Sequence, residues 1–427
     1  MDTKAIRTAL RRWGLYVRTF IKWTAAAAVI GAACGLVGAL VHFGVHEVTA
    51  FRGTHPWVLY LLPLAGLVIV GFYKLTGTDG LGTDDIIDAV HQGKLLPILL
   101  LPAIFFGTIL THLCGGSAGR EGAALQMGGT IGQYLGRHFQ LDDRDLRVAT
   151  LAGMAAFFAA LFGTPLAATV FAIMVISIGV IYHVALYPSL LAALVAYGVS
   201  IHLGVEPTRF AVSVPEQTVG MFVRVALLGV LCALVSILFC QVMHGAGHLM
   251  KRIRNPWLRV ACGGAAIIVL TLIFGTDYNG AGMEIVTAAV EQGIVAVPWA
   301  FLLKLIFTAI TLAAGFKGGE VVPSFFVGAT FGCAAAPLLG LPAGFGAAVG
   351  LAAVFCGVTN CPLASTLLAV ELFGAEGLLY FALACCLSYM LSGYQGLYSS
   401  QTILYSKLKA QFINVHTNAH HAGEKTE

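Results

Sequence analysis

Long apolar runs separated by short polar segments fill most of this chain. Each run is continuous rather than alternating, which is typical of helices and does not fit the strands of a closed β-barrel. Several runs are shorter than the ~20 residues that a simple transmembrane helix needs, or are interrupted by glycine. The pattern predicts an all-α, polytopic membrane protein with re-entrant and broken helices, which in transporters surround a buried site. The runs cover residues 23–48, 57–73, 96–113, 147–205, 217–247, 260–274, 298–315, 324–357 and 362–392.

The composition supports this class of protein. Of the 427 residues, 58% are hydrophobic and only 10% are charged, whereas a soluble domain carries about 25% charged residues. The net charge of +4 comes from a few basic loops and indicates no nucleic-acid partner. The cysteines show no metal-binding spacing, so we expect neither a metal nor a cofactor.

Basic residues gather at two places. Residues 1–22 precede the first apolar run and hold six basic residues against one acid, with no cleavable signal after them. The second cluster lies in residues 251–259. The positive-inside rule predicts that both clusters are cytoplasmic. We therefore expect residues 1–22 to be a cytoplasmic basic segment and residues 406–427 to be a short cytoplasmic tail.

The chain matches itself at an offset close to 200 residues. This indicates two repeats, a first membrane repeat at 23–212 and a second at 213–405. The matches align Gly80–Asp84 with Gly280–Glu284, residues 89–93 with 289–293, Gly119–Glu121 with Gly318–Glu320, and Pro165–Ala167 with Pro362–Ala364.

Charge predicts how the two repeats are oriented. The apolar run 23–48 has its basic cluster in front of it, and its counterpart 217–247 has its cluster behind it. If both clusters face the cytoplasm, the two helices cross the membrane in opposite directions. The repeats are then inverted, and such folds hold their substrate near the midplane, where the N-termini of half-helices converge.

The glycine-rich stretch Gly115–Gly122 is the most informative segment for chemistry. It sets Arg120 and Glu121 between two apolar runs, where a carboxylate costs roughly 2.5–3.5 kcal/mol to insert. A helix that starts after glycines also presents free N–H groups, which attract anions. The segments Gly80–Asp84, Gly318–Pro323 and Gly393–Ser399 are further candidates for the same site.

These motifs resemble those of the CLC anion transporters and channels. The sequence Gly119-Arg120-Glu121-Gly122 resembles the family's gating signature, with Ala123 in place of its proline. Gly80-Leu81-Gly82 resembles the first anion-binding turn, Gly318–Pro323 the third, and Leu397-Tyr398-Ser399 the late tyrosine segment. The resemblance implies the CLC fold and a homodimer with one pathway in each subunit.

Departures from the chloride-handling members favour the fluoride/proton antiporter branch. Leu81 replaces a serine that coordinates chloride, and the segment Gly315–Glu320 resembles the fluoride branch, including its extra glutamate. Met174 and Val175 lie where chloride/proton exchangers keep a proton-relay glutamate. Val322 is a departure from the fluoride branch, because that branch is expected to have threonine at this position.

The resemblance implies roles for individual residues. Glu121 is the gating glutamate, which occupies the anion site when charged and leaves it when protonated. Glu320 is a second proton-coupling glutamate. Two carboxylates at one anion site repel each other, so one of them should be protonated part of the time and able to donate a hydrogen bond to fluoride. The expected anion-binding residues are Gly80, Leu81, Gly82, Gly119, Arg120, Gly122, Gly318, Gly319, Val321, Val322 and Tyr398.

The resulting hypothesis is a transporter that exports fluoride in exchange for protons across the bacterial inner membrane. A chloride/proton exchanger or passive chloride channel on the same fold is the first alternative. A non-transporting membrane scaffold explains the hydropathy but not the charged glycine turns. A membrane-embedded hydrolase lacks a nucleophile–base pair.

Each candidate residue also has a purely structural interpretation. Glu121 could pair with Arg120 or cap a helix, Glu320 could stabilise a helix N-terminus, and Tyr398 could be an interfacial aromatic. We expect Lys304 to bond to carbonyls and Glu371 to be architectural. Asn360 either lines the pathway or caps the helix that begins at Pro362.

Overall fold

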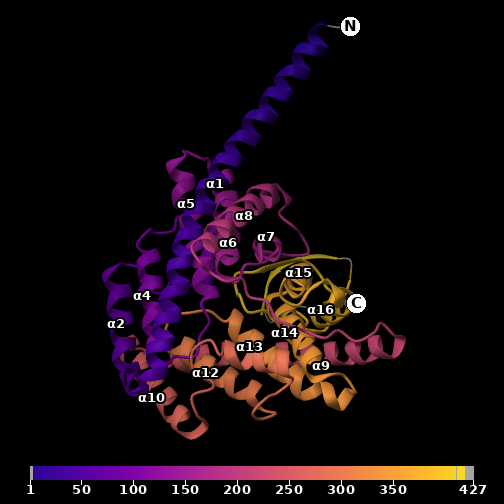
Figure 1. The fold of residues 1–427 in the computed structure, drawn as a ribbon. Coiled ribbons are helices and arrows are strands. Elements are labelled where there is room, and N and C mark those ends of the chain that lie inside the picture. The colour runs from indigo at the N-terminus through magenta and orange to yellow at the C-terminus, as the bar shows by residue number, and fades with distance from the viewer. Residues whose placement is uncertain (1–2, 410, 419–427) are drawn as a thin grey trace.

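The computed structural model describes residues 3–409 and 411–418, and most of these residues are helical (Figure 1). The α-helices are α1 (Thr3–Thr54), α2 (Leu62–Leu75), α3 (Thr83–Gln92), α4 (Leu100–Leu113), α5 (Glu121–His138), α6 (Asp143–Phe162), α7 (Pro165–Met174), α8 (Leu186–His202), α9 (Val219–Lys251), α10 (Pro256–Phe274), α11 (Met283–Thr287), α12 (Ala300–Ala314), α13 (Val321–Ala335), α14 (Ala343–Thr359), α15 (Pro362–Phe373) and α16 (Leu378–Leu391).

Short helical turns and three strands complete the chain. The 3-10 turns are η1 (Pro56–Leu61), η2 (His183–Ala185), η4 (Ala336–Leu339) and η5 (Ala375–Gly377), and a π-turn η3 (Ala288–Gln292) follows α11. The strands are β1 (Ser177–Ile178), β2 (Thr402–Tyr405) and β3 (Phe412–His416).

The helices α1–α8 recur in the same order as α9–α16. The most extensive helix contacts in the molecule are those of α5 with α6 and of α13 with α14, which are the same pair in the two halves. Figure 1 shows the halves meeting along their length, with α10 of the second half packed beside α2 of the first. The internal duplication expected from the sequence is therefore present in the fold.

Helix length separates spanning helices from half-helices. Seven helical segments in the described residues are long and apolar enough to cross a membrane: residues 11–54, 56–75, 143–162, 183–202, 219–251, 256–274 and 321–339. By contrast, α4 has 14 residues and α7 has 10, so at 1.5 Å per residue they fall well short of the ~30 Å hydrocarbon layer. These are the broken helices that the interrupted apolar runs predicted.

Helix α1 runs without a break through residue 22, so the expected limit between the cytoplasmic segment and the first repeat lies inside one helix. The structure does not describe the side chains of residues 3–10 or any part of residues 419–427, so the first basic side chains and the end of the expected tail lie outside the described residues. Lys22, near the end of the basic segment, forms an ion pair with Asp145 at the start of α6.

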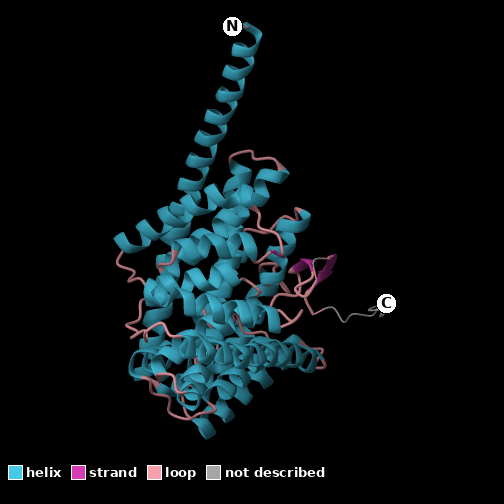
Figure 2. Ribbon diagram, turned by 90° about the vertical axis from the view of Figure 1, so that its right-hand side faces the viewer, coloured by secondary structure: helices cyan, strands magenta, loops and turns pink. Residues whose placement is uncertain are grey.

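The three strands form a small sheet that the all-α prediction did not include. Strand β1, after α7, pairs in parallel with β2, which pairs antiparallel with β3 of the tail. Figure 2 shows this sheet at the edge of the helical body, next to the C-terminal end. Strands of two to five residues are too short to show an alternating pattern in the sequence.

The sheet lies beside the end of α3 and the last third of α9. His91 at the end of α3 bonds to the carbonyl of Ile176, next to β1, and lies within electrostatic range of Arg147 on α6 and His416 on β3. Asn418 beyond β3 bonds to His244, in the last third of α9.

The two repeats meet most closely at Gly119 and Gly319. Each residue donates its backbone N–H to the carbonyl of the other at 2.7 Å, which makes a two-residue antiparallel bridge. A second reciprocal pair flanks the bridge, because Ser117 N donates to Thr311 Oγ1 at 3.1 Å and Lys317 N donates to Thr111 Oγ1 at 3.2 Å. Both pairs relate positions about 200 residues apart, so a pseudo-two-fold axis passes through the bridge.

This approach leaves no room for side chains at the crossing. A Cβ atom on Gly319 would lie 2.8 Å from the Cα of Gly122, and one on Gly122 would lie 2.7 Å from the Cα of Gly319. The sequence match set Gly119 against Gly318, but the bridge pairs Gly119 with Gly319, so the match was wrong by one residue at this turn. The contact between the two backbones requires the glycines at 122 and 319.

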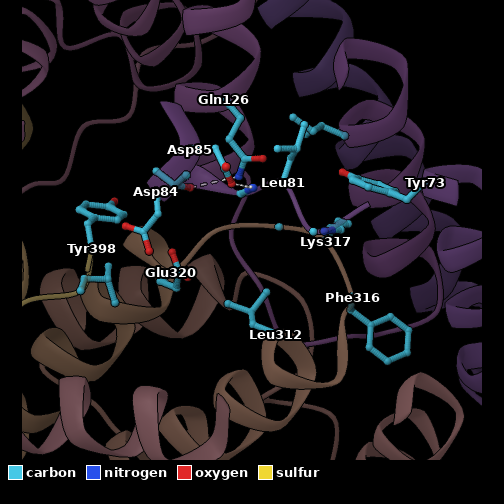
Figure 3. A pocket seen from close by; sticks show the side chains of 16 residues that line it. Tyr73, Leu81, Asp84, Asp85, Gln126, Leu312, Phe316, Lys317, Glu320 and Tyr398 are labelled. Atoms are coloured by element: carbon cyan, nitrogen blue, oxygen red, sulfur yellow. Dashed lines mark hydrogen bonds between the residues drawn. The ribbon is translucent and has the colours of Figure 1, made fainter. Parts of the chain in front are cut away.

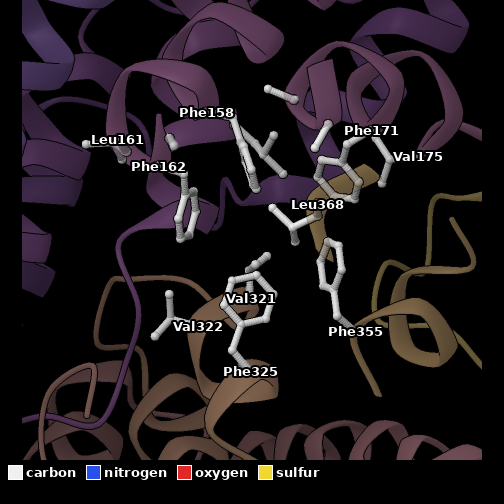
Figure 4. Packing of buried hydrophobic residues seen from close by; sticks show 14 of the residues in the cluster. Phe158, Leu161, Phe162, Phe171, Val175, Val321, Val322, Phe325, Phe355 and Leu368 are labelled. Atoms are coloured by element: carbon white, nitrogen blue, oxygen red, sulfur yellow. The ribbon is translucent and has the colours of Figure 1, made fainter. Parts of the chain in front are cut away.

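Phenylalanines fill the core above the bridge (Figure 4). Phe158 and Phe355, which the sequence match pairs between repeats, are linked through Phe171, with ring centroids 5.4 and 5.5 Å apart. Phe325 of α13 lies 5.1 Å from Phe355. All four side chains are buried, so this side of the bridge is dry and apolar.

We expect Gly319→Ala to destabilise the protein by about 3 kcal/mol or more, because backbone at the crossing must separate to admit the methyl group. Gly247→Ala is the matched control, because nothing lies within 4 Å of a Cβ at that helical position. Thermal unfolding of the two variants in detergent measures the difference. Equal unfolding midpoints would show that the crossing is not tightly packed.

Candidate anion site

Two helices begin at the bridge. Helix α5 starts at Glu121 and α13 starts at Val321, immediately after Gly119 and Gly319. The first N–H groups of a helix have no acceptor within it, and Pro323 removes one of them from α13. The bridge therefore brings together the positive ends of two half-helices from opposite repeats, which is the arrangement that binds anions.

Glu121 lies at this junction and is buried, with 1% of its surface exposed. Its carboxylate is near a Cβ position on Gly119 that also faces Val322 and Pro323, so the side chain folds back over the bridge toward α13. The N–H groups of Arg120, Glu121 and Val322 act on it. Neither carboxylate oxygen, however, has a well-formed hydrogen bond to any of the described residues.

Arg120 forms only a loose pair with this carboxylate. Its Nε lies 3.7 Å from Oε1 of Glu121, and its Nη1 lies 3.1 Å from Nδ1 of His42 on α1. Arg120 therefore anchors the turn to α1. A simple salt bridge does not account for Glu121, because the carboxylate keeps both oxygens free of close partners.

Glu320 lies on the opposite side of the bridge, just before α13. Together with the turn at residues 80–85, it lines a cavity of about 290 Å³ (Figure 3). Its carboxylate points toward that of Asp84, and the two lie within electrostatic range. The cavity is lined by Tyr73, Gly80, Leu81, Gly82, Thr83, Asp84, Asp85, Ile104, Gln126, Leu312, Phe316, Lys317, Gly318, Glu320, Leu397 and Tyr398.

Tyr398 lies at the buried end of this cavity. Its side chain is 2% exposed, and its hydroxyl has no hydrogen-bond partner within residues 3–409 and 411–418. It is within electrostatic range of Glu320, Asp84 and Glu121. A buried hydroxyl without a partner is costly, and this one is free to donate to an anion.

The structure divides the sequence-predicted residues into two adjoining groups. Gly80, Leu81, Gly82, Gly318, Glu320 and Tyr398 line the cavity. The bridge and the two helix starts consist of Gly119, Glu121, Gly122, Gly319, Val321 and Val322, and Arg120 precedes the first of these helices. Tyr398 is close to carboxylates of both groups, so one site connects them.

Sequence reasoning missed most of the polar residues on the cavity wall. Asp84, Gln126, Lys317 and Tyr73 line it, and Lys317 places its ammonium 4.1 Å from the centre of the Tyr73 ring. Asp84 ends one candidate glycine segment and Lys317 directly precedes another, so a count of ionisable residues near those turns could have found them. Nothing in the sequence singles out Gln126 or Tyr73.

Two structural expectations are confirmed. Lys304 is fully buried, and its ammonium donates to the carbonyls of Tyr278 at 3.1 Å and Gly280 at 2.6 Å. Glu371 at the end of α15 accepts from the N–H groups of Leu166 and Ala167, the first turn of α7 in the other repeat.

Asn360 does not cap the helix that begins at Pro362, so that alternative is wrong. It takes a left-handed conformation (φ 60°) and ends α14, while α15 has no side-chain cap. Its amide donates to the carbonyl of Gln395 at 3.0 Å and accepts from Lys407 at 2.5 Å. The reason is local: asparagine tolerates the left-handed conformation that a helix end requires, and the equivalent position in the first repeat is Gly163.

Fold and site together define a membrane protein of two inverted repeats with an anion-attracting junction. Comparisons with known proteins agree. The voltage-gated chloride channel family matches residues 65–393, and the chain belongs to this family, the CLC family. The fold shared with solved CLC structures extends over nine tenths of the chain.

Individual relatives refine the comparison. The chain is 39% identical over 398 residues to a chloride/fluoride channel protein of Pseudomonas syringae pv. tomato, covering 90% of this chain and 87% of that protein. It is similar to the crystal structure of a CLC-type fluoride/proton antiporter, with a TM-score of 0.86, 33% identity, and coverage of 90% and 98%. An H⁺/Cl⁻ exchange transporter of Cronobacter sakazakii is 27% identical over 397 residues, with 84% of each chain covered.

We expect Lys304→Met to lower the stability by about 3 kcal/mol, because two buried carbonyls lose a charged donor. Lys74→Met is the control, since Lys74 is exposed at the end of α2 with its ammonium 5.3 Å from the centre of the Trp257 ring. Thermal unfolding in detergent compares them. A Lys304 variant as stable as the control would contradict the role assigned to these bonds.

Proposed function

We propose that this protein is a proton-coupled antiporter that exports fluoride in exchange for protons. The observation that carries the proposal is Glu121: a buried carboxylate with no well-formed hydrogen bond among the described residues, at the point where helix starts of both repeats converge. Such a group can bind a proton or be replaced by an anion, and few buried carboxylates have both options.

Competition at this junction couples the two ions. Charged Glu121 is attracted to the free N–H groups of the helix starts and so occupies the place of an anion. When it is protonated that attraction weakens, and fluoride takes its place. The side chain then carries its proton away from the junction, and the return of the charged carboxylate displaces fluoride. One binding place thus serves two ions that cannot occupy it together.

The surroundings suit fluoride in particular. Fluoride holds its water strongly, so a site must replace that water with several close donors. The N–H groups of Val321 and Val322 and the hydroxyl of Tyr398 supply three, and protonated Glu320 would supply a fourth. Leu81, on the cavity wall, brings no hydroxyl for a larger halide.

A passive anion channel of the same family is the second candidate. The relative from Pseudomonas syringae is named a channel, and a buried gate glutamate is compatible with both modes. Coupled proton movement separates them. The resemblance of the whole fold to a fluoride/proton antiporter supports the coupled mode.

We place the protein in the bacterial inner membrane with both termini in the cytoplasm, as a homodimer with one pathway in each subunit. The two basic clusters, at residues 1–22 and 251–259, support this orientation through the positive-inside rule. Export fits the chemistry of the ion: hydrogen fluoride crosses bilayers as a neutral acid, dissociates inside, and leaves fluoride trapped.

Wild-type protein in fluoride-loaded liposomes should move protons inward as fluoride leaves. For Glu121→Gln we expect proton flux to fall about 100-fold or more, because the amide cannot carry a proton. A fluoride electrode and a pH electrode record both fluxes, with the exposed Glu376→Gln as control. Proton-coupled flux in the glutamine variant would exclude Glu121 as the carrier.

Glu320→Gln should also reduce proton flux, by about tenfold or more, because the second carboxyl passes protons toward the junction. Fluoride binding should weaken less, since the amide can still donate a hydrogen bond. The same liposomes and the same Glu376→Gln control apply. If coupled flux were unchanged, Glu320 would be only a helix-start acid.

A further inference from the structure

We propose that Asp84 is the residue through which protons reach Glu320 from the cytoplasmic face. This inference rests on the proposed antiport and adds the missing half of its proton path. The relay glutamate expected of chloride/proton exchangers is absent here, because Met174 and Val175 stand in its place. Another ionisable group must therefore connect the buried carboxylates to water.

The cavity of 290 Å³ provides that connection. Gly80 at its rim is exposed, Asp84 and Asp85 on its wall are half-buried, and the Tyr398 hydroxyl at its inner end is fully buried. The rim lies on the face that holds residues 256–259, because Lys317 is within electrostatic range of Arg259 and Lys74 stacks on Trp257. The positive-inside rule makes this face cytoplasmic.

Asp84 stands midway along this route. It belongs to the first turn of α3, and Oδ1 accepts the N–H of Ser400 at 3.0 Å, two residues beyond Tyr398. That bond uses one lone pair and leaves Oδ2 free, and Figure 3 shows the carboxylate turned toward Glu320. The neighbouring Asp85 is already occupied by Lys94 at 3.0 Å and by the N–H of Gly82 at 2.9 Å.

The charges around Asp84 suit a proton better than an anion. Asp85 and Asp88 on its own helix and Glu320 from the other repeat are acidic, and His244 of α9 and Lys317 are the facing basic groups. Adjacent carboxylates disfavour full ionisation. A proton held by Asp84 can pass to the Glu320 carboxylate, directly or through water, and Asp84 then takes another from the cytoplasmic solution.

The buried hydroxyl of Tyr398 is independent evidence that this cavity has an occupant. It lacks a partner within the described ranges and lies at the same inner end. The equivalent position in the second repeat lacks these features: the repeat-related residue of Asp84 is Glu284, which is exposed. The two repeats have therefore diverged at the position where a proton path is needed.

The test is Asp84→Asn in fluoride-loaded liposomes. Asparagine keeps an oxygen for the N–H of Ser400 but cannot release a proton. We expect proton flux to fall about 100-fold, with Glu284→Gln, the repeat-related control, at the wild-type rate. Asp84→Glu keeps a carboxyl and should restore coupled flux to within about threefold of wild type. Size-exclusion profiles show that each variant is folded.

The outcomes separate this inference from the proposed function. If the wild-type protein moves fluoride without protons, both the proposed antiport and the Asp84 route are overturned. If the wild type couples the two ions and Asp84→Asn shows the same proton-to-fluoride ratio and rate, only the Asp84 route is overturned. Asp84→Glu as inactive as Asp84→Asn also overturns it, because a merely structural carboxylate would explain that result. If Asp84→Asn fails to fold, Asp84→Glu decides: coupled flux supports the route and its loss overturns it.

Discussion

Two backbones touch at the centre of this protein, and the rest of the site depends on that contact. Gly119 and Gly319 each donate a backbone N–H to the carbonyl of the other, and the nitrogen–oxygen distance is 2.7 Å in both bonds. No side chain fits between the two backbones at this contact, so the first residues of α5 and α13 lie close together. Free N–H groups from both repeats then converge on one small volume, and their positive potential is what a buried carboxylate or an anion requires.

The environment of the contact differs on its two sides. On one side the phenylalanines of α6, α7, α13 and α14 form a dry core. On the other the cavity with Asp84, Glu320 and Tyr398 leads toward the face of the basic clusters. An ion at the junction is thus shielded from water by the phenylalanines and lies near titratable groups on the side of the cavity. This arrangement favours binding one ion at a time over a continuous water-filled pore.

Two charged side chains outside the candidate site differ from Glu121 in having close backbone partners. Lys304 and Glu371 are satisfied by backbone groups across the repeat boundary. Glu121 and Tyr398 lack such partners among the described residues. An unsatisfied buried polar group costs about 1–3 kcal/mol, so an ion that bonded to these two groups would recover that cost.

Periodicity, charge and internal repetition in the sequence determined the membrane class, the inverted halves and the turns at Glu121 and Glu320, because each depends on residues close together in the chain. Only the tertiary structure decided which turns touch and what surrounds them. Asp84 meets Ser400 across 316 positions, and the small sheet and the role of Asn360 depend on contacts as distant. Such pairings follow from how two whole repeats pack, which no local pattern encodes.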